Sequence, residues 1–93
     1  MSKLTAAQIK AVLPLVPDWK RRGKVLSRTF EFRDFVAAVK FVNDVARLAE
    51  KAWHHPDIEI RWNCVTLTLT THDEGGLTPK DFVLAQKLDR LAK

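Results

Sequence analysis

The stretch from Asp57 to Thr71 constrains the fold most, because its alternation of apolar and polar residues changes parity in the middle. A single straight strand cannot change parity, since successive side chains point to opposite faces of a sheet. A two-residue turn at Asn63 and Cys64 would return both apolar sets to one side, and asparagine tolerates the backbone conformation of such turns. The two sets are Ile58, Ile60 and Trp62, then Val65, Leu67 and Leu69. The pattern therefore predicts a β-hairpin with one apolar face.

The register of this hairpin gathers the histidines of the chain. A turn at Asn63 and Cys64 places His55 opposite His72 at the open end, and His54 arrives beside them from the preceding helix. The chain has 3 histidines, and imidazole suits acid and base work near neutral pH. The alternative is that each histidine only ends a helix or a strand and hydrogen-bonds to the backbone.

Three helices are predicted from their start signals. Thr5 and Gln8 have the spacing of a capping box, so a short helix begins at Ala6 and stops before Pro14. Asp34 caps a second helix, which runs to about Ala52 because of Pro56. Its expected buried face is Phe35, Ala38, Val39, Val42, Val45, Ala46 and Ala49. Thr78, Pro79 and Asp81 start the last helix, whose apolar side is Phe82, Ala85, Leu88 and Ala92.

A second hairpin is predicted between Trp19 and Phe32, with its turn at Gly23. The order is then α-β-β-α-β-β-α, which predicts an α+β fold: a four-stranded antiparallel sheet with helices packed on one face. Residues 1–93 are expected to form one domain. The other sheet face is expected to be polar, because Asp57, Glu59 and Arg61 alternate with the apolar positions.

Charge and cysteine content limit the functional classes. The net charge is +5, but Lys20, Arg21, Arg22 and Lys24 surround a predicted turn and are interpreted as surface, so no nucleic-acid partner is expected. No apolar stretch is long enough for a membrane span. The single cysteine, Cys64, cannot form an intramolecular disulfide, so a cytoplasmic location is expected.

Other chemistries fit less well. A zinc site is an alternative for three histidines, but the adjacent His54 and His55 tend to point apart, and the usual ligand spacings are missing. Gly75 and Gly76 lack the lysine and the spacing of a phosphate-binding loop. Proton transfer is therefore the favoured chemistry, with no metal.

The spacing of seven residues from Glu50 onward is similar to a family pattern. It runs Glu50, three residues, His54, His55, Pro56, five residues, Trp62, nine residues, His72, eight residues and Asp81. This pattern resembles the signature of the pterin-4a-carbinolamine dehydratases. One departure is Ile58, where some members have an aromatic residue on which the pterin could stack. Trp53 either supplies this stacking surface instead or belongs to the core.

The resemblance implies a pterin substrate, 4a-hydroxytetrahydrobiopterin, and its dehydration to quinonoid dihydrobiopterin during tetrahydrobiopterin recycling. It implies no cofactor, and it links the protein to an aromatic amino-acid hydroxylase, whose product is this substrate. By resemblance, His54 and His72 have acid and base roles, and His55 mainly binds the substrate.

Three further residues are interpreted from position. Glu50 reaches His54 if the helix continues, or else is a solvated carboxylate. Asp81 is expected mainly to cap the last helix; a direct part in the chemistry is the alternative. Trp62 is expected in the core because it lies on the same strand face as Ile58 and Ile60.

The competing class is a non-enzymatic interaction module. Some members of the family act as dimerisation cofactors for a transcription factor, and an apolar helix stripe could serve such a role. The apolar helices and the polar sheet face of so small a chain also predict a homo-oligomer, a dimer or a tetramer.

Overall fold

The computed structural model describes residues 2–93, and within them the predicted α-β-β-α-β-β-α order is confirmed. Two short 3₁₀ segments, η1 and η2, accompany the helices and strands. The elements are α1 (Ala6–Val12), η1 (Leu13–Leu15), β1 (Lys20–Arg22), β2 (Val25–Glu31), α2 (Phe35–Ala52), β3 (Asp57–Arg61), β4 (Cys64–Leu69), η2 (His72–Glu74) and α3 (Pro79–Leu91).

The predicted helix caps are present. The Thr5 hydroxyl accepts from the Gln8 N–H at 3.2 Å, and the Gln8 side chain accepts from the Thr5 N–H at 2.9 Å. The Asp34 carboxylate accepts from the N–H of Ala37 at 2.8 Å. Each cap satisfies backbone donors that have no partner within the first helical turn, which explains why these helices begin where the sequence predicts.

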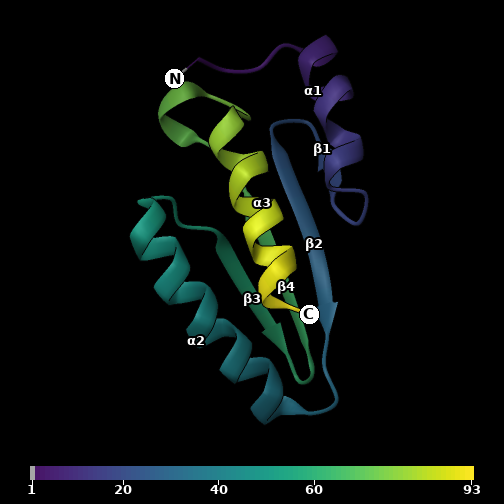
Figure 1. The fold of residues 1–93 in the computed structure, drawn as a ribbon, viewed down its shortest axis with the longest axis vertical. Coiled ribbons are helices and arrows are strands. Elements are labelled where there is room, and N and C mark those ends of the chain that lie inside the picture. The colour runs from purple at the N-terminus through teal and green to yellow at the C-terminus, as the bar shows by residue number, and fades with distance from the viewer. Residues whose placement is uncertain (1) are drawn as a thin grey trace.

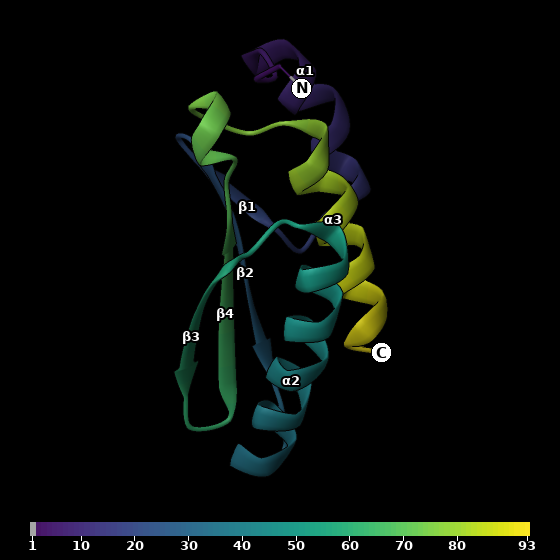
Figure 2. The same ribbon diagram turned by 90° about the vertical axis from the view of Figure 1, so that its left-hand side faces the viewer.

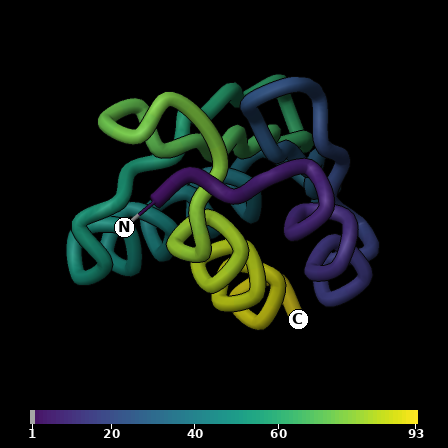
Figure 3. Tube along the Cα trace, turned by 90° about the horizontal axis from the view of Figure 1, so that it is seen from above, coloured from purple at the N-terminus to yellow at the C-terminus, as the bar shows by residue number. Residues whose placement is uncertain are grey.

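The four strands form one antiparallel sheet in the order β1-β2-β4-β3. All three helices lie on the same face of this sheet, as Figures 1 and 2 show. Seen from above, α3 lies between α2 and α1 (Figure 3). The predicted fold class is confirmed, and the central β2-β4 pair lies beneath the helical layer.

The core lies between this layer and the sheet. Phe30 of β2 and Phe41 of α2 stack with ring centroids 4.9 Å apart, a separation typical of favourable aromatic pairs. The buried apolar residues that join the elements include Leu26, Val65, Leu67 and Leu69 from the sheet, Ala38 and Val45 from α2, and Phe82, Leu84, Ala85 and Leu88 from α3. The predicted apolar side of α3 is therefore buried at Phe82, Ala85 and Leu88, whereas Ala92, just after the helix, is half-buried.

The predicted buried face of α2 is only partly right. Phe35 and Ala46 are exposed, whereas Phe41, which the periodicity argument left out, is buried. The face is centred on Ala38, Phe41, Val45 and Ala49, because α2 crosses the sheet at an angle and its N-terminal end extends beyond the strands (Figure 2).

The predicted register of the hairpin formed by β3 and β4 is wrong by two residues. Arg61 pairs with Cys64, so the turn consists of Trp62 and Asn63. The side-chain amide of Asn63 donates to the carbonyl of Phe32 at 2.8 Å, and the Phe32 N–H donates to the Asn63 carbonyl at 2.8 Å. These two hydrogen bonds hold the turn against the end of β2. A shift of two keeps every side chain on its predicted face.

Trp62 is not a core residue, which corrects the prediction from parity. It has φ 47 and is 70% exposed at the tip of the hairpin. For a non-glycine residue this left-handed geometry costs about 1–2 kcal/mol.

The outer face of the sheet is polar, as predicted. Thr29 of β2 hydrogen-bonds to Thr66 of β4 through their hydroxyls at 2.8 Å. Strand β3 forms one edge of the sheet, and both of its isoleucines, Ile58 and Ile60, are exposed. Within the described residues, no helix is both long and apolar enough to cross a membrane.

Candidate active site

The two adjacent histidines lie where α2 stops. Trp53 has φ 51, its N–H donates to the Glu50 carbonyl at 3.3 Å, and the His54 N–H donates to the Ala49 carbonyl at 3.2 Å. This pair of hydrogen bonds is the Schellman motif, in which a left-handed residue ends a helix. Pro56 keeps His55 out of helical geometry. As a result His54 is buried, whereas His55 is exposed.

His54 contacts the start of α3 through a buried carboxylate. Its Nε2 lies 2.5 Å from Oδ1 of Asp81, which is fully buried. The second carboxylate oxygen of Asp81 accepts from the Thr78 N–H and from the Thr71 hydroxyl, both at 2.9 Å. Asp81 therefore caps α3, as predicted, and also fixes the orientation of the His54 imidazole.

Glu50 does not reach His54, which corrects the expectation from helical spacing. The helix ends at Ala52 and the chain changes direction at the left-handed Trp53, so His54 does not lie one helical turn above Glu50. Glu50 instead lies 2.6 Å from Nε2 of His55 through its Oε1. Each of the two adjacent histidines thus has its own carboxylate, one buried and one exposed.

His72 follows the C-terminal end of β4 and reaches the site from there. It is the first residue of η2 and is exposed. Thr71 pairs with Gly76 across this segment, and Gly75 has φ 74, a geometry that glycine adopts without strain. The short loop turns back toward α3 and carries His72 past the end of the sheet. His55 does not face His72 in the strand ladder, because β3 begins only at Asp57.

All three histidines nevertheless line one cavity of about 230 Å³. Its other walls come from Trp53 at the end of α2, from the strand end at Thr70 and Thr71, from Asp73, and from Lys80 in the first turn of α3. The predicted convergence of the histidines is therefore present, although the register that suggested it is wrong.

Trp53 is 77% exposed and lines this cavity, so the alternative that placed it in the core is wrong. Sequence reasoning missed Thr71 as a partner of Asp81 and Lys80 as a wall of the cavity. The only signal for Lys80 was its place beside Asp81 in the predicted first turn of the last helix.

Within residues 2–93, no group of three or more His, Cys, Asp or Glu side chains is arranged to hold a metal ion. Cys64 lies at the turn end of the hairpin, next to Asn63, as predicted. The chemistry that these side chains can supply is proton transfer: three imidazoles share a cavity, and two of them are oriented by carboxylates.

Comparisons with known proteins identify the family. The family model described as pterin 4 alpha carbinolamine dehydratase matches residues 2–91. A protein of Thermomicrobium roseum is 52% identical over 92 residues, covering 99% of both chains, and one of Nocardia farcinica is 50% identical, covering 97% of this chain and 95% of its own. Both are named as candidate pterin-4-alpha-carbinolamine dehydratases.

Two solved structures are also similar. The transcriptional coactivator/pterin dehydratase of Brucella melitensis has a TM-score of 0.94 and 33% identity, covering 99% of this chain and 100% of its own. A pterin dehydratase-like protein, described as a RuBisCO assembly factor of the alpha-carboxysome, has a TM-score of 0.71 and 27% identity, covering 81% of this chain and 89% of its own. The family match over nearly the whole chain shows that this protein belongs to the pterin 4 alpha carbinolamine dehydratase family.

Proposed function

We propose that the protein is a hydro-lyase that removes water from 4a-hydroxytetrahydrobiopterin, the product of an aromatic amino-acid hydroxylase, to give quinonoid dihydrobiopterin. The observation that carries this proposal is the cavity shared by His54, His55 and His72, in which a buried carboxylate fixes one imidazole. The family match supports the same chemistry. No metal or organic cofactor takes part in the proposed reaction.

The reaction requires the protein to donate one proton to the substrate and to remove another from it. The C4a–O bond breaks, and the departing hydroxyl takes a proton and leaves as water. The ring nitrogen N5 loses its proton, and its electron pair forms the new double bond to C4a. Two positioned imidazoles, one protonated and one neutral, supply both transfers without any other reagent.

His54 is suited to the role of base. When the neutral imidazole donates its Nε2–H to Asp81, the lone pair of Nδ1 is left to accept the proton of N5. The imidazolium that forms then lies against the Asp81 carboxylate. His72 is exposed, lines the same cavity and donates a proton to the leaving hydroxyl. His55, which is paired with Glu50, contributes mainly to substrate binding.

A direct assay tests this proposal. The substrate is generated in the cuvette by a hydroxylase, and its decay is followed by absorbance with and without the purified protein. We expect catalysed water loss at sub-stoichiometric protein concentration. Decay at the uncatalysed rate, with a protein that circular dichroism shows to be folded, would contradict the proposal.

A second candidate function is an interaction module, and one observation favours it. At the N-terminal end of α2, Phe35 and Val36 are exposed, Val36 to 75%, and with Val39, Lys40 and Asn43 they border an open hollow. The Brucella neighbour is described as a transcriptional coactivator as well as a dehydratase. The substitution Val36→Lys separates the two functions, because this residue lies outside the histidine cavity. Dehydration should continue unchanged, while any association through this end of α2 should weaken.

A further inference from the structure

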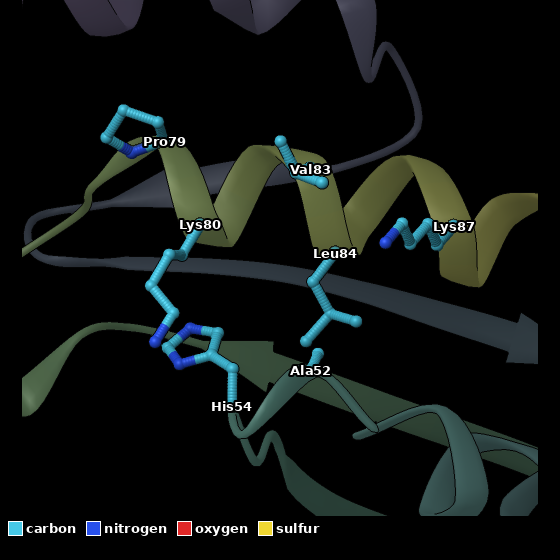
Figure 4. A pocket seen from close by; sticks show the side chains of 7 residues that line it. All are labelled: Ala52, His54, Pro79, Lys80, Val83, Leu84 and Lys87. Carbon is cyan, nitrogen blue, oxygen red and sulfur yellow. The ribbon is translucent and has the colours of Figure 1, made fainter. Parts of the chain in front are cut away.

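A second cavity adjoins the histidine site and lies alongside α3. It has a volume of about 280 Å³ and is bordered by the C-terminal end of α2 and by the first three turns of α3. Figure 4 shows Lys80 and Leu84 of α3 pointing toward His54 and Ala52 at the end of α2. The residues that line the cavity are Ala52, His54, Pro79, Lys80, Val83, Leu84 and Lys87.

Two residues connect this cavity with the proposed active site. His54 and Lys80 line the 280 Å³ cavity, and both also line the 230 Å³ cavity of the three histidines. The two cavities therefore adjoin each other at His54 and Lys80. The two spaces differ in chemistry: histidines, threonines and Asp73 border the first, whereas Ala52, Pro79, Val83 and Leu84 give the second mainly apolar walls.

The two ends of the second cavity carry positive charge. Lys80 lies at the end near His54, and Lys87 lies two turns further along α3 (Figure 4). Lys87 follows Lys80 by seven positions of helix, a rise of about 10 Å. Within residues 2–93 neither ammonium group forms an ion pair with a carboxylate. An apolar channel that ends at an unpaired ammonium group complements a ligand with an apolar body and an anionic end.

We propose that this cavity binds the C6 substituent of the pterin substrate, and that the preferred substrate class is a reduced pterin whose substituent has an aryl spacer ending in carboxylates. This inference rests on the proposed function, because it places the pterin ring among the histidines. The short, uncharged dihydroxypropyl group of a biopterin would leave the second cavity unfilled. An aminobenzoyl spacer would lie against Val83 and Leu84 and bring a terminal carboxylate to Lys87.

Stable ligands test the inference by equilibrium binding. The probes are 7,8-dihydrobiopterin, 7,8-dihydrofolate and the dimethyl ester of dihydrofolate, measured by quenching of tryptophan fluorescence. We expect dihydrofolate to bind about tenfold more tightly than dihydrobiopterin, since each gained charge-assisted contact is worth roughly that factor. The ester should lose most of this advantage because it has no carboxylate, and added salt should reduce the advantage further.

Substitutions locate the contact. Lys87→Met should lower the affinity for dihydrofolate about tenfold and leave that for dihydrobiopterin unchanged, whereas Lys87→Arg should retain the preference. Lys40→Met removes a lysine from α2, outside both cavities, and is the matched control. Dehydration of 4a-hydroxytetrahydrobiopterin should be the same in Lys40→Met as in the wild type.

Three outcomes would overturn the inference. Equal affinity for the two pterins, or equal losses in Lys87→Met and Lys40→Met, would show that the second cavity does not recognise the substituent. Tight binding of N-(4-aminobenzoyl)glutamate alone, with no gain for intact dihydrofolate, would indicate a separate anion site. If dihydrobiopterin binds and its 4a-hydroxy form is dehydrated, only this inference has failed; if neither pterin binds and no dehydration is seen, the proposed function has failed with it.

Discussion

Asp81 Oδ1 lies 2.5 Å from His54 Nε2, although 27 positions separate the two residues in the sequence. The contact joins the reversal at the end of α2 to the first turn of α3. Because Asp81 also accepts the N–H of Thr78, the carboxylate that caps a helix is the one that orients the imidazole. Helix stability and the geometry of the proposed active site therefore depend on the same side chain.

The first prediction concerns the acid and the base. His54→Ala and His72→Ala should each lower kcat by about a hundredfold to ten-thousandfold, the usual contribution of a positioned proton-transfer group, with smaller changes in KM. His55→Ala should act mainly on KM. The double variant His54→Ala with His72→Ala should fall furthest, toward the uncatalysed rate. Steady-state kinetics measure these effects, and thermal melts must show that each variant is folded. Wild-type kcat in both single variants would exclude these roles.

The second prediction separates orientation from capping. Asp81→Asn should lower kcat at least about tenfold, because an amide does not hold the His54 tautomer that accepts a proton. It should also destabilise the fold by about 1–3 kcal/mol through its buried hydrogen bonds. Glu74→Gln, an exposed substitution in η2, is the control and should change neither value. Unchanged kcat at a temperature where Asp81→Asn remains folded would show that Asp81 caps α3 but does not orient His54 for catalysis.

The third prediction concerns the strained hairpin tip. Trp62→Asn should leave the free energy of unfolding unchanged or raise it by up to about 1–2 kcal/mol, because asparagine adopts left-handed geometry more readily. Trp19→Asn should instead cost several kcal/mol, about the loss expected for a buried aromatic residue. Urea denaturation of both variants measures the difference. A large loss in Trp62→Asn would mean that this tryptophan is covered in the native protein.

The fourth prediction is that activity is independent of metal. Dehydration should persist after dialysis against a chelator, and metal analysis of the active protein should find no stoichiometric zinc. The physical reason is that imidazoles alone supply both proton transfers. Loss of activity on chelation, with recovery when zinc is added back, would contradict this prediction.

The fifth prediction is that the protein forms a homo-oligomer. Light scattering at micromolar concentration should give the mass of a dimer or a tetramer. We expect the exposed edge strand β3, which carries Ile58 and Ile60, to be covered in the oligomer, because an unpaired strand edge favours association. Ile60→Lys should therefore weaken assembly more than Glu59→Lys, which changes the polar face of the same strand. A monomeric mass for the wild type would reject the prediction.

Part of the fold could be predicted because its signals are local. The capping residues Thr5, Asp34 and Thr78 mark helix starts through contacts within one turn, and alternation assigns each residue of β3 and β4 to a face. Register could not be predicted from alternation, since a shift of two residues leaves every face unchanged. The hydrogen bonds between Asn63 and Phe32, which are distant in sequence, decided it.

The candidate site divides in the same way. The sequence by itself determined which side chains are available for proton transfer and that the stop at Pro56 and the hairpin after it bring the histidines toward one end of the sheet. Only the tertiary structure decided their partners. A left-handed Trp53 turned His55 toward Glu50 and His54 toward Asp81, and packing of α2 beside α3 opened a second cavity next to His54. Spacing along a chain specifies contacts only while one regular element continues, and α2 ends before the first of these histidines.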